Sequence, residues 1–297
     1  MVGGVRMVIN KHEFIERPEF TREFWESFEF KVLMGGMGDD TAMLIAELYE
    51  RGFEPDEIVF CDTGSEFDHT YEFIKHLEKW CKERNWSKVV TLRKLDKFDK
   101  PLSVISLCKD QNTLPAVAFG SKSCSLRFKV ETADKYFNNN PKCHNAWGIK
   151  KKGVPLNTYT GKILRLVGLN ADEPVRVNGW SNHAKWIQSF PLFDWGIGEA
   201  ESEAVERVGL YYPGKSSCTV CPNMTHSEIA MLRDNYPDKF KESLAIEARY
   251  IEVNKRDDST TKGLGRSKTW SEKLKEYDAD PGKYKRMTDT KPCECGR

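Results

Sequence analysis

The chain has 297 residues, with 46 Lys and Arg against 45 Asp and Glu and a formal net charge of +1. This length allows one large α/β domain or two modest ones, and a composition that is 39% hydrophobic and 31% charged excludes collagen-like, low-complexity and mostly disordered chains. Because the net charge is close to zero, attraction to nucleic acid or to a membrane surface would have to come from a local patch.

Strand, loop and helix patterns alternate through the first third of the chain. Short apolar runs predict strands at 30–34, 57–61 and 89–92, and apolar residues at helical spacing predict helices at 41–49 and 69–84. This alternation is typical of an α/β fold in which an open parallel sheet carries helices on both faces.

The second half is richer in cysteine and ends in a basic segment. A further strand is predicted at 163–169, and helices are predicted at 199–208 and 225–253. We therefore expect an α/β domain over residues 1–254. Residues 255–297 hold twelve Lys and Arg against eight Asp and Glu with few aliphatic side chains, which predicts a mobile or peripherally docked tail.

Polar residues follow three of the predicted strands, at 35–40, 62–66 and 172–176. The first cluster is a glycine-rich turn before a helix, and the backbone N–H groups of such a turn form an anion site that usually takes phosphate. A tight connection without a ligand is the alternative, because the turn matches neither a Walker A loop nor a dinucleotide fingerprint. The carboxyl ends of parallel strands share one edge of a sheet, so the three clusters together predict a ligand site there.

In their order along the chain, these segments resemble the phosphoadenosine-phosphosulfate (PAPS) reductase-like branch of the N-type ATP pyrophosphatases, within the PP-loop or adenine nucleotide alpha hydrolase-like superfamily. Residues 33–44 are similar to the PP-loop, 62–71 to the second-strand motif and 167–176 to a third motif. Residues 191–195 and 218–224 match segments of the C-terminal half. The resemblance implies a PP-loop or HUP-like sheet that binds ATP or a related adenine nucleotide.

The resemblance also implies which residues contact the nucleotide: Gly35, Gly36, Met37, Gly38, Asp39, Thr41, Asp62, Thr63, Gly64, Glu66, Asp172, Glu173 and Arg176. The PP-loop is degenerate, because Leu33 and Asp40 stand where the family has serine hydroxyls for phosphate. Asp39 and Asp40 are the expected catalytic carboxylates. Either this pair holds Mg²⁺ that bridges to the nucleotide, or the phosphate site is damaged and ATP cleavage is lost.

Nine cysteines without a signal peptide argue against a disulfide framework and favour metal binding. Cys218 and Cys221 have the spacing at which two thiolates from one turn reach one ion, although a redox pair has the same spacing. Cys124 lies in a segment that resembles a segment of the same family. In that family, the segment brings a cysteine close to the turn that carries the paired cysteines. With Cys293 as fourth ligand, or Cys295 in its place, the set suits either a [4Fe–4S] cluster or Zn²⁺.

Two functions follow. The first is an enzyme of sulfur chemistry, either an oxidoreductase that reduces adenylylsulfate or an ATP-dependent sulfurtransferase that modifies nucleic acid, with an iron–sulfur cluster. The C-terminal 294–297 segment resembles a family motif with a catalytic cysteine, so Cys295 is an alternative nucleophile. The second is a non-catalytic nucleotide- or nucleic-acid-binding protein with a structural Cys₄ metal site.

The basic tail and the apolar pattern of the chain predict its partners and its location. The tail segment 262–270 combines glycine, basic groups and Trp270, which suits contact with DNA or tRNA through phosphates and one stacked base. No stretch approaches ~18 uninterrupted apolar residues, so no membrane partner is expected. The absence of a leader-like segment in residues 1–10 predicts a cytoplasmic protein, and the branch that the chain resembles suggests a phage or prokaryotic origin.

Overall fold

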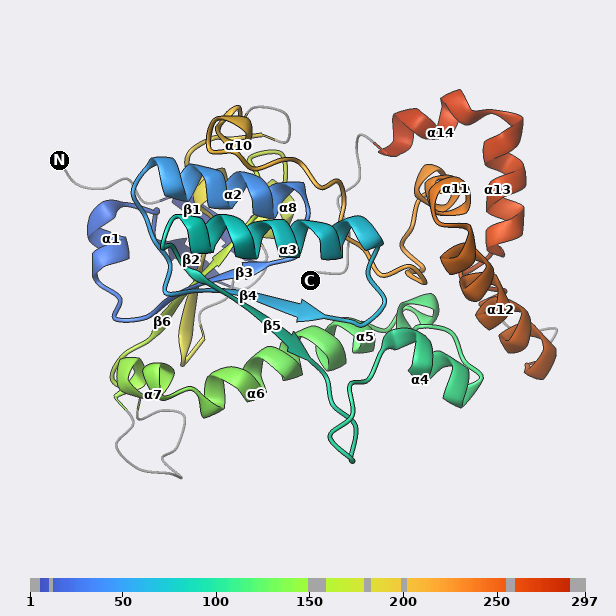
Figure 1. Ribbon diagram of the computed structural model, residues 1–297, viewed down its shortest axis with the longest axis horizontal. Coiled ribbons are helices and arrows are strands. Elements are labelled where there is room, and N and C mark those ends of the chain that lie inside the picture. The colour runs from blue at the N-terminus through green and yellow to red at the C-terminus, as the bar shows by residue number, and fades with distance from the viewer. Residues whose placement is uncertain are drawn as a thin grey trace.

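The computed structural model describes residues 6–10, 13–148, 159–178, 183–198, 202–254 and 260–288. Five strands form one open sheet in which every neighbouring pair is parallel, in the order β5-β4-β3-β6-β7 (Figure 1). The strands are β3 (Lys31–Gly35), β4 (Glu57–Asp62), β5 (Lys88–Arg93), β6 (Ile163–Val167) and β7 (Trp186–Ser189). The predicted fold class, an open parallel α/β sheet with helices on both faces, is confirmed.

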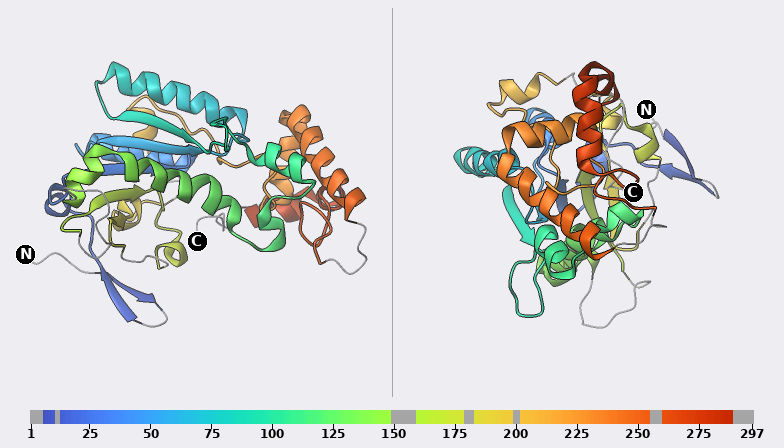
Figure 2. Two further views of the ribbon diagram at one scale, coloured as in Figure 1. Left: turned by 90° about the horizontal axis from the view of Figure 1, so that it is seen from below. Right: turned by 90° about the vertical axis from the view of Figure 1, so that its right-hand side faces the viewer.

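Helices connect the strands and extend the fold beyond the sheet. The first half holds α1 (Arg22–Glu26), α2 (Asp39–Glu50), α3 (Asp68–Glu83), α4 (Val104–Gln111), the 3₁₀ turn η1 (Ala116–Phe119), α5 (Ser123–Ser125), the π-helix η2 (Leu126–Val130), α6 (Glu131–Asn139) and α7 (Pro141–Trp147). The second half holds α8 (Pro174–Val177), α9 (Pro191–Asp194), α10 (Ala204–Arg207), α11 (His226–Asn235), α12 (Pro237–Val253), α13 (Trp270–Ala279) and α14 (Pro281–Thr288). A separate antiparallel hairpin, β1 (Arg6–Asn10) and β2 (Glu13–Arg17), extends away from the sheet (Figure 2).

The two faces of the sheet are buried by alternate residues of each strand. On β4, Ile58 and Phe60 join the cluster under α2 and α3, whereas Val59 and Cys61 join the cluster under α6 and α7. All six residues of β4 are buried. A strand that is covered on both sides reads as a continuous apolar run, which explains why this strand is recognisable in the sequence.

A third apolar cluster forms a helical lobe beyond the end of the sheet to which β4 points (Figure 1). The lobe consists of α4 and α11 to α14. Leu264 and Trp270 are fully buried in this cluster, and Lys273 Nζ donates a hydrogen bond of 3.1 Å to the carbonyl of Met224. Part of the predicted basic tail is therefore docked on α11 and contributes to a core.

Several predicted elements differ from the structure. The helix expected at 225–253 is two helices, because Pro237 disfavours helical backbone at Tyr236, where φ is −134° and ψ is 59°. The described part of the helix expected at 199–208 is the single turn α10. Strand β7 and the β1–β2 hairpin were not predicted. Within the described residues no helix is long and apolar enough to cross a membrane.

A buried ion pair attaches the N-terminal segment to the fold. Arg17 pairs with Asp194, and their side chains are 0% and 1% exposed. Arg17 Nη1 donates to Asp194 Oδ2 over 2.9 Å, and the backbone N–H of Phe20 donates to the same oxygen over 3.1 Å. Asp194, in the 191–195 motif, is thus occupied by a structural partner.

Trp270→Ala tests whether the docked tail is part of the core. Removing a fully buried Trp leaves a cavity, so we expect a loss of about 3–5 kcal/mol in the free energy of unfolding, measured by urea denaturation. Ile251→Ala, at a position on α12 that is 43% exposed, should change stability by less than about 0.5 kcal/mol. Equal effects of the two substitutions would contradict the packing described here.

Candidate functional site

The site lies where the chain changes direction across the sheet, between β3 and its neighbour β6. The loop that follows β6 touches the first turn of α2, which follows β3. Asn170 Nδ2 donates a hydrogen bond of 2.9 Å to Asp40 Oδ1, and a Cβ on Gly168 would lie 2.8 Å from the carbonyl oxygen of Asp40. In open α/β sheets this switch point is where ligands bind.

The loop from Gly35 to Gly38, here the glycine loop, begins α2 and places Asp39 and Asp40 in its first turn. The backbone N–H groups of Gly36 and Met37 both donate to Thr41 Oγ1 at 3.1 Å. Met37 has φ 61° and a fully buried side chain, so only its backbone is available to a ligand. The predicted glycine-rich turn is therefore present, and two of its amides are held by the threonine hydroxyl.

Residues 214–217, here the covering segment, lie directly on the glycine loop. The backbone N–H of Gly214 donates to Asp39 Oδ1 over 2.7 Å. A Cβ on Gly38 would lie 2.9 Å from the backbone nitrogen of Ser216, so a larger residue does not fit at Gly38. This segment is not among the predicted site residues. Its signal in the sequence is the run Gly214, Lys215, Ser216, Ser217 immediately before the paired cysteines.

Burial at this contact affects the charge of Asp39. Desolvation raises the pKa of the Asp39 carboxyl, while the Gly214 N–H and the nearby His69 lower it. His69 is fixed beside the covering segment, because Nδ1 is 2.9 Å from the Tyr236 hydroxyl and Nε2 is 3.2 Å from the carbonyl of Lys215. A carboxylate that has lost part of its hydration is strongly stabilised by a nearby cation. Asp39 is therefore suited to bind Mg²⁺.

Three of the four predicted metal ligands line one cavity, here the cysteine pocket. Cys124 comes from α5, and Cys218 and Cys221 come from the turn that follows the covering segment. Burial raises the pKa of both Cys218 and Cys221, so without a metal these groups are neutral thiols near pH 7. Among the residues that the structure describes, no three His, Cys, Asp or Glu side chains converge closely enough to hold a single metal ion.

The second-strand cluster positions the paired cysteines. The Asp62 carboxylate accepts hydrogen bonds from the Gly64 N–H at 2.7 Å and the Tyr71 hydroxyl at 2.9 Å, and it pairs with Arg93 Nε at 2.9 Å. The Thr63 hydroxyl donates to Glu66 Oε1 at 2.7 Å. Because Glu66 forms a β-bridge with Cys218, the loop at 62–66 holds the turn that carries that thiol.

The third cluster is held together by its own contacts. Arg176 pairs with Glu173 Oε1, and Glu173 Oε2 is buried without a hydrogen-bond partner in the described chain. The backbone N–H of Asp172 donates to Asn170 Oδ1 at 3.0 Å. Asn170, which was not among the predicted site residues, is the residue that joins this cluster to the glycine loop through Asp40.

The remaining predicted contacts are at the C-terminus. Cys293 and Cys295 lie outside the described residues, so their roles as fourth ligand or nucleophile stay predictions. The expectation that Trp270 stacks on a nucleic-acid base is wrong, because its ring is 0% exposed and packs in the helical lobe. A fully buried ring has no face free for a base.

Comparison with known proteins gives no family assignment. No protein-family model matches the chain, and no curated protein matches it. One solved structure that is similar is the U34-tRNA thiolase NcsA from Methanococcus maripaludis with its [4Fe-4S] cluster, at 16% sequence identity and a TM-score of 0.31. That match covers 85% of this chain and 81% of the thiolase. A match at this identity and TM-score carries no argument about function. The function of the site is therefore argued from its own geometry.

Asp39→Asn tests the electrostatics of the site. The raised pKa means that the ionised carboxylate destabilises the folded state, a penalty that is absent well below pH 3.8 and complete above the raised pKa. Asparagine keeps an acceptor for the Gly214 N–H, so we expect a higher Tm than the wild type at pH 7 and no gain near pH 3.

Asp96→Asn is the control of opposite sign. Hydrogen bonds from the Lys100 and Phe98 backbone lower the pKa of Asp96, so its carboxylate stabilises the fold at pH 7 and the substitution should lower Tm there. Thermal unfolding followed by circular dichroism at both pH values measures the two effects. A lower Tm for Asp39→Asn than for the wild type at pH 7 would show that the ionised Asp39 carboxylate does not destabilise the folded state.

Proposed function

We propose that the chain is a PAPS reductase-like member of the PP-loop superfamily that binds an adenine nucleotide at the glycine loop and performs sulfur chemistry at the cysteine pocket. The observation that supports this is the covering segment. It touches Gly38 and Asp39 with its backbone, it lines the cysteine pocket with Ser216 and Ser217, and it continues into Cys218. An activated phosphate and a sulfur-binding site would therefore be neighbours.

The cysteine pocket fits an iron–sulfur cluster by the chemistry of its donors. Cys124, Cys218 and Cys221 are three soft thiols around one cavity, and Cys293 would be the fourth ligand, with Cys295 as the alternative. A [4Fe–4S] cluster distributes its thiolate ligands over several irons, whereas a single zinc ion takes all of its thiolates at ~2.3 Å. When bound, such a cluster supplies electrons or an iron that binds sulfide.

The surrounding residues would bind and orient the nucleotide. Asp39 and Asp40 in the first turn of α2 would hold Mg²⁺, which would offset the negative charge of the phosphates. Lys129 lines the cysteine pocket, where its ammonium group would offset the negative charge of bound thiolates. This arrangement suits adenylylsulfate reduction or adenylation followed by sulfur transfer to nucleic acid.

A non-catalytic binding protein is the second candidate. Two observations favour it: Leu33 is fully buried in the core, and the Gly36 and Met37 amides already bond to Thr41. In this case the glycine loop would hold a nucleotide without cleaving it, and the cysteine pocket would hold a structural metal.

The metal content separates these candidates first. We expect anaerobically purified full-length protein to absorb near ~400 nm and to contain about four irons per chain. Cys124→Ser, Cys218→Ser and Cys221→Ser should each lose most of the iron, whereas Cys143→Ala, a buried thiol between α7 and the sheet, should retain it. Colourless protein with about one zinc, or iron that persists in all three serine variants, would contradict the cluster.

Nucleotide turnover is the second test. We expect the wild type with Mg²⁺ to convert ATP to AMP, measured by chromatography, and Asp39→Ala to be at least ~100-fold slower because a ligand for the cation is lost. Glu50→Ala, at the other end of α2, should keep the wild-type rate. ATP binding without AMP formation by the wild type would contradict the adenylation reaction and leave adenylylsulfate reduction and the non-catalytic alternative.

A further inference from the structure

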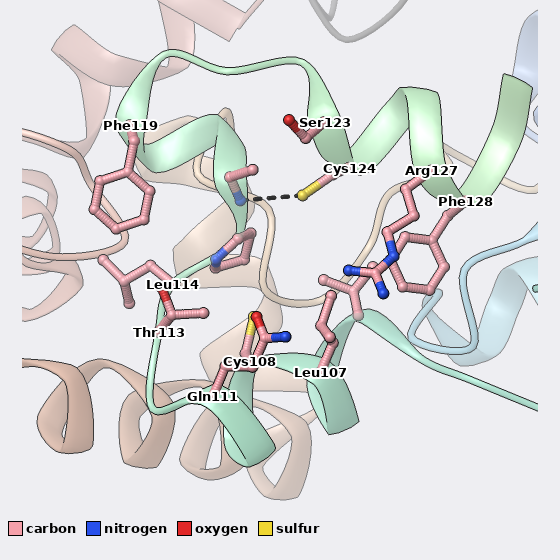
Figure 3. A pocket seen from close by; sticks show the side chains of 13 residues that line it. Leu107, Cys108, Gln111, Thr113, Leu114, Phe119, Ser123, Cys124, Arg127 and Phe128 are labelled. Carbon is pink, nitrogen blue, oxygen red and sulfur yellow. Dashed lines mark hydrogen bonds between the residues drawn. The ribbon is translucent and has the colours of Figure 1, made fainter. Parts of the chain in front are cut away.

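Figure 3 shows a second cavity, here the side pocket, which has a volume of about 200 Å³. It shares Cys124 with the cysteine pocket. Its walls come from α4, η1, α5 and η2 and from the loop between α4 and η1. Cys124 is therefore a common wall: its backbone belongs to α5, and its Sγ accepts a hydrogen bond of 3.1 Å from the Ala116 N–H. Anything that fills the side pocket lies beside the proposed sulfur site.

The side pocket combines an apolar interior with a polar rim. Leu114 and Phe128 line it and are 2% and 1% exposed. Gln111 and Arg127 line it from α4 and η2, and both residues are exposed (Figure 3). In the described chain neither side chain has a hydrogen bond or an ion pair. Unpaired polar groups around an apolar cavity are the usual composition of a ligand site.

Size and shape restrict the ligand. Drug-sized ligands occupy roughly 300–1,000 Å³, so a cavity of about 200 Å³ suits one ring-sized group. Phe119 lines the pocket with a ring that is 47% exposed, and the planar guanidinium of Arg127 offers a second stacking surface. The amide of Gln111 can both donate to and accept from the polar edge of a ring.

We infer that the side pocket receives one unstacked nucleobase of a single-stranded nucleic acid. This inference rests on the proposed function, because it identifies nucleic acid as the molecule that accepts sulfur in the proposed chemistry. Lys122, which immediately precedes α5, and Lys129 on η2 are both exposed and supply positive charge for the adjoining phosphates. The base edge would then lie against the wall that Cys124 forms.

The test measures base recognition apart from charge. The probes are two fluorescently labelled DNA strands of equal length, one with a single thymine among abasic positions and one wholly abasic. Full-length protein without metal or ATP should bind the thymine strand roughly tenfold more tightly by fluorescence anisotropy, because base stacking contributes ~1–3 kcal/mol. Gln111→Ala and Arg127→Ala should each reduce that preference by at least threefold, whereas Lys122→Ala should weaken both strands equally.

A second measurement locates the base. A strand with 5-iodouracil in place of thymine should crosslink under ultraviolet light to a peptide within residues 104–128, identified by mass spectrometry. Equal affinity for the two strands, no measurable binding, a crosslink elsewhere or full competition by free AMP would each overturn the inference. Neither metal nor ATP is present in these binding measurements. A negative result here therefore does not bear on the iron content or the nucleotide turnover, and negative results in those two tests do not bear on base binding.

Discussion

The close approach of one backbone segment to another is the constraint on which this site depends. Residues 214–217 pass so near Gly38 that no side chain fits at that position, and the Gly214 N–H is bonded to Asp39. This contact joins the carboxyl edge of the sheet to the turn that carries Cys218 and Cys221. The glycine loop and the cysteine pocket are therefore one structural unit, and a substitution that displaces either would disturb the other.

Much of the sheet could be predicted from the sequence because its central strands are buried on both faces. The continuous apolar run of β4 is an example. Strand β7 gives no such signal, since three of its four residues are only partly buried. The docked tail also gives a weak signal in the sequence, because α13 contains few aliphatic residues. Its attachment depends on Trp270 and on Leu264, which precedes the helix.

The site could be predicted only where its residues are close in sequence. The glycine loop and the paired cysteines are local patterns. The structure has the loop between β3 and α2 and the cysteine turn beside Glu66. The pairing of Asp62 with Arg93, and the covering of Asp39 by Gly214, join positions far apart in the chain. Contacts of this kind follow from tertiary packing and leave no periodic trace in the sequence.

The docking of α13 also bears on the order in which the molecule can be assembled during translation. The turn with Cys218 and Cys221 leaves the ribosome well before Trp270 and Lys273, which complete the helical lobe behind it. Domains generally fold as their segments emerge, N-terminal parts first. The nascent chain therefore presents these thiols to solvent before the lobe behind them is complete.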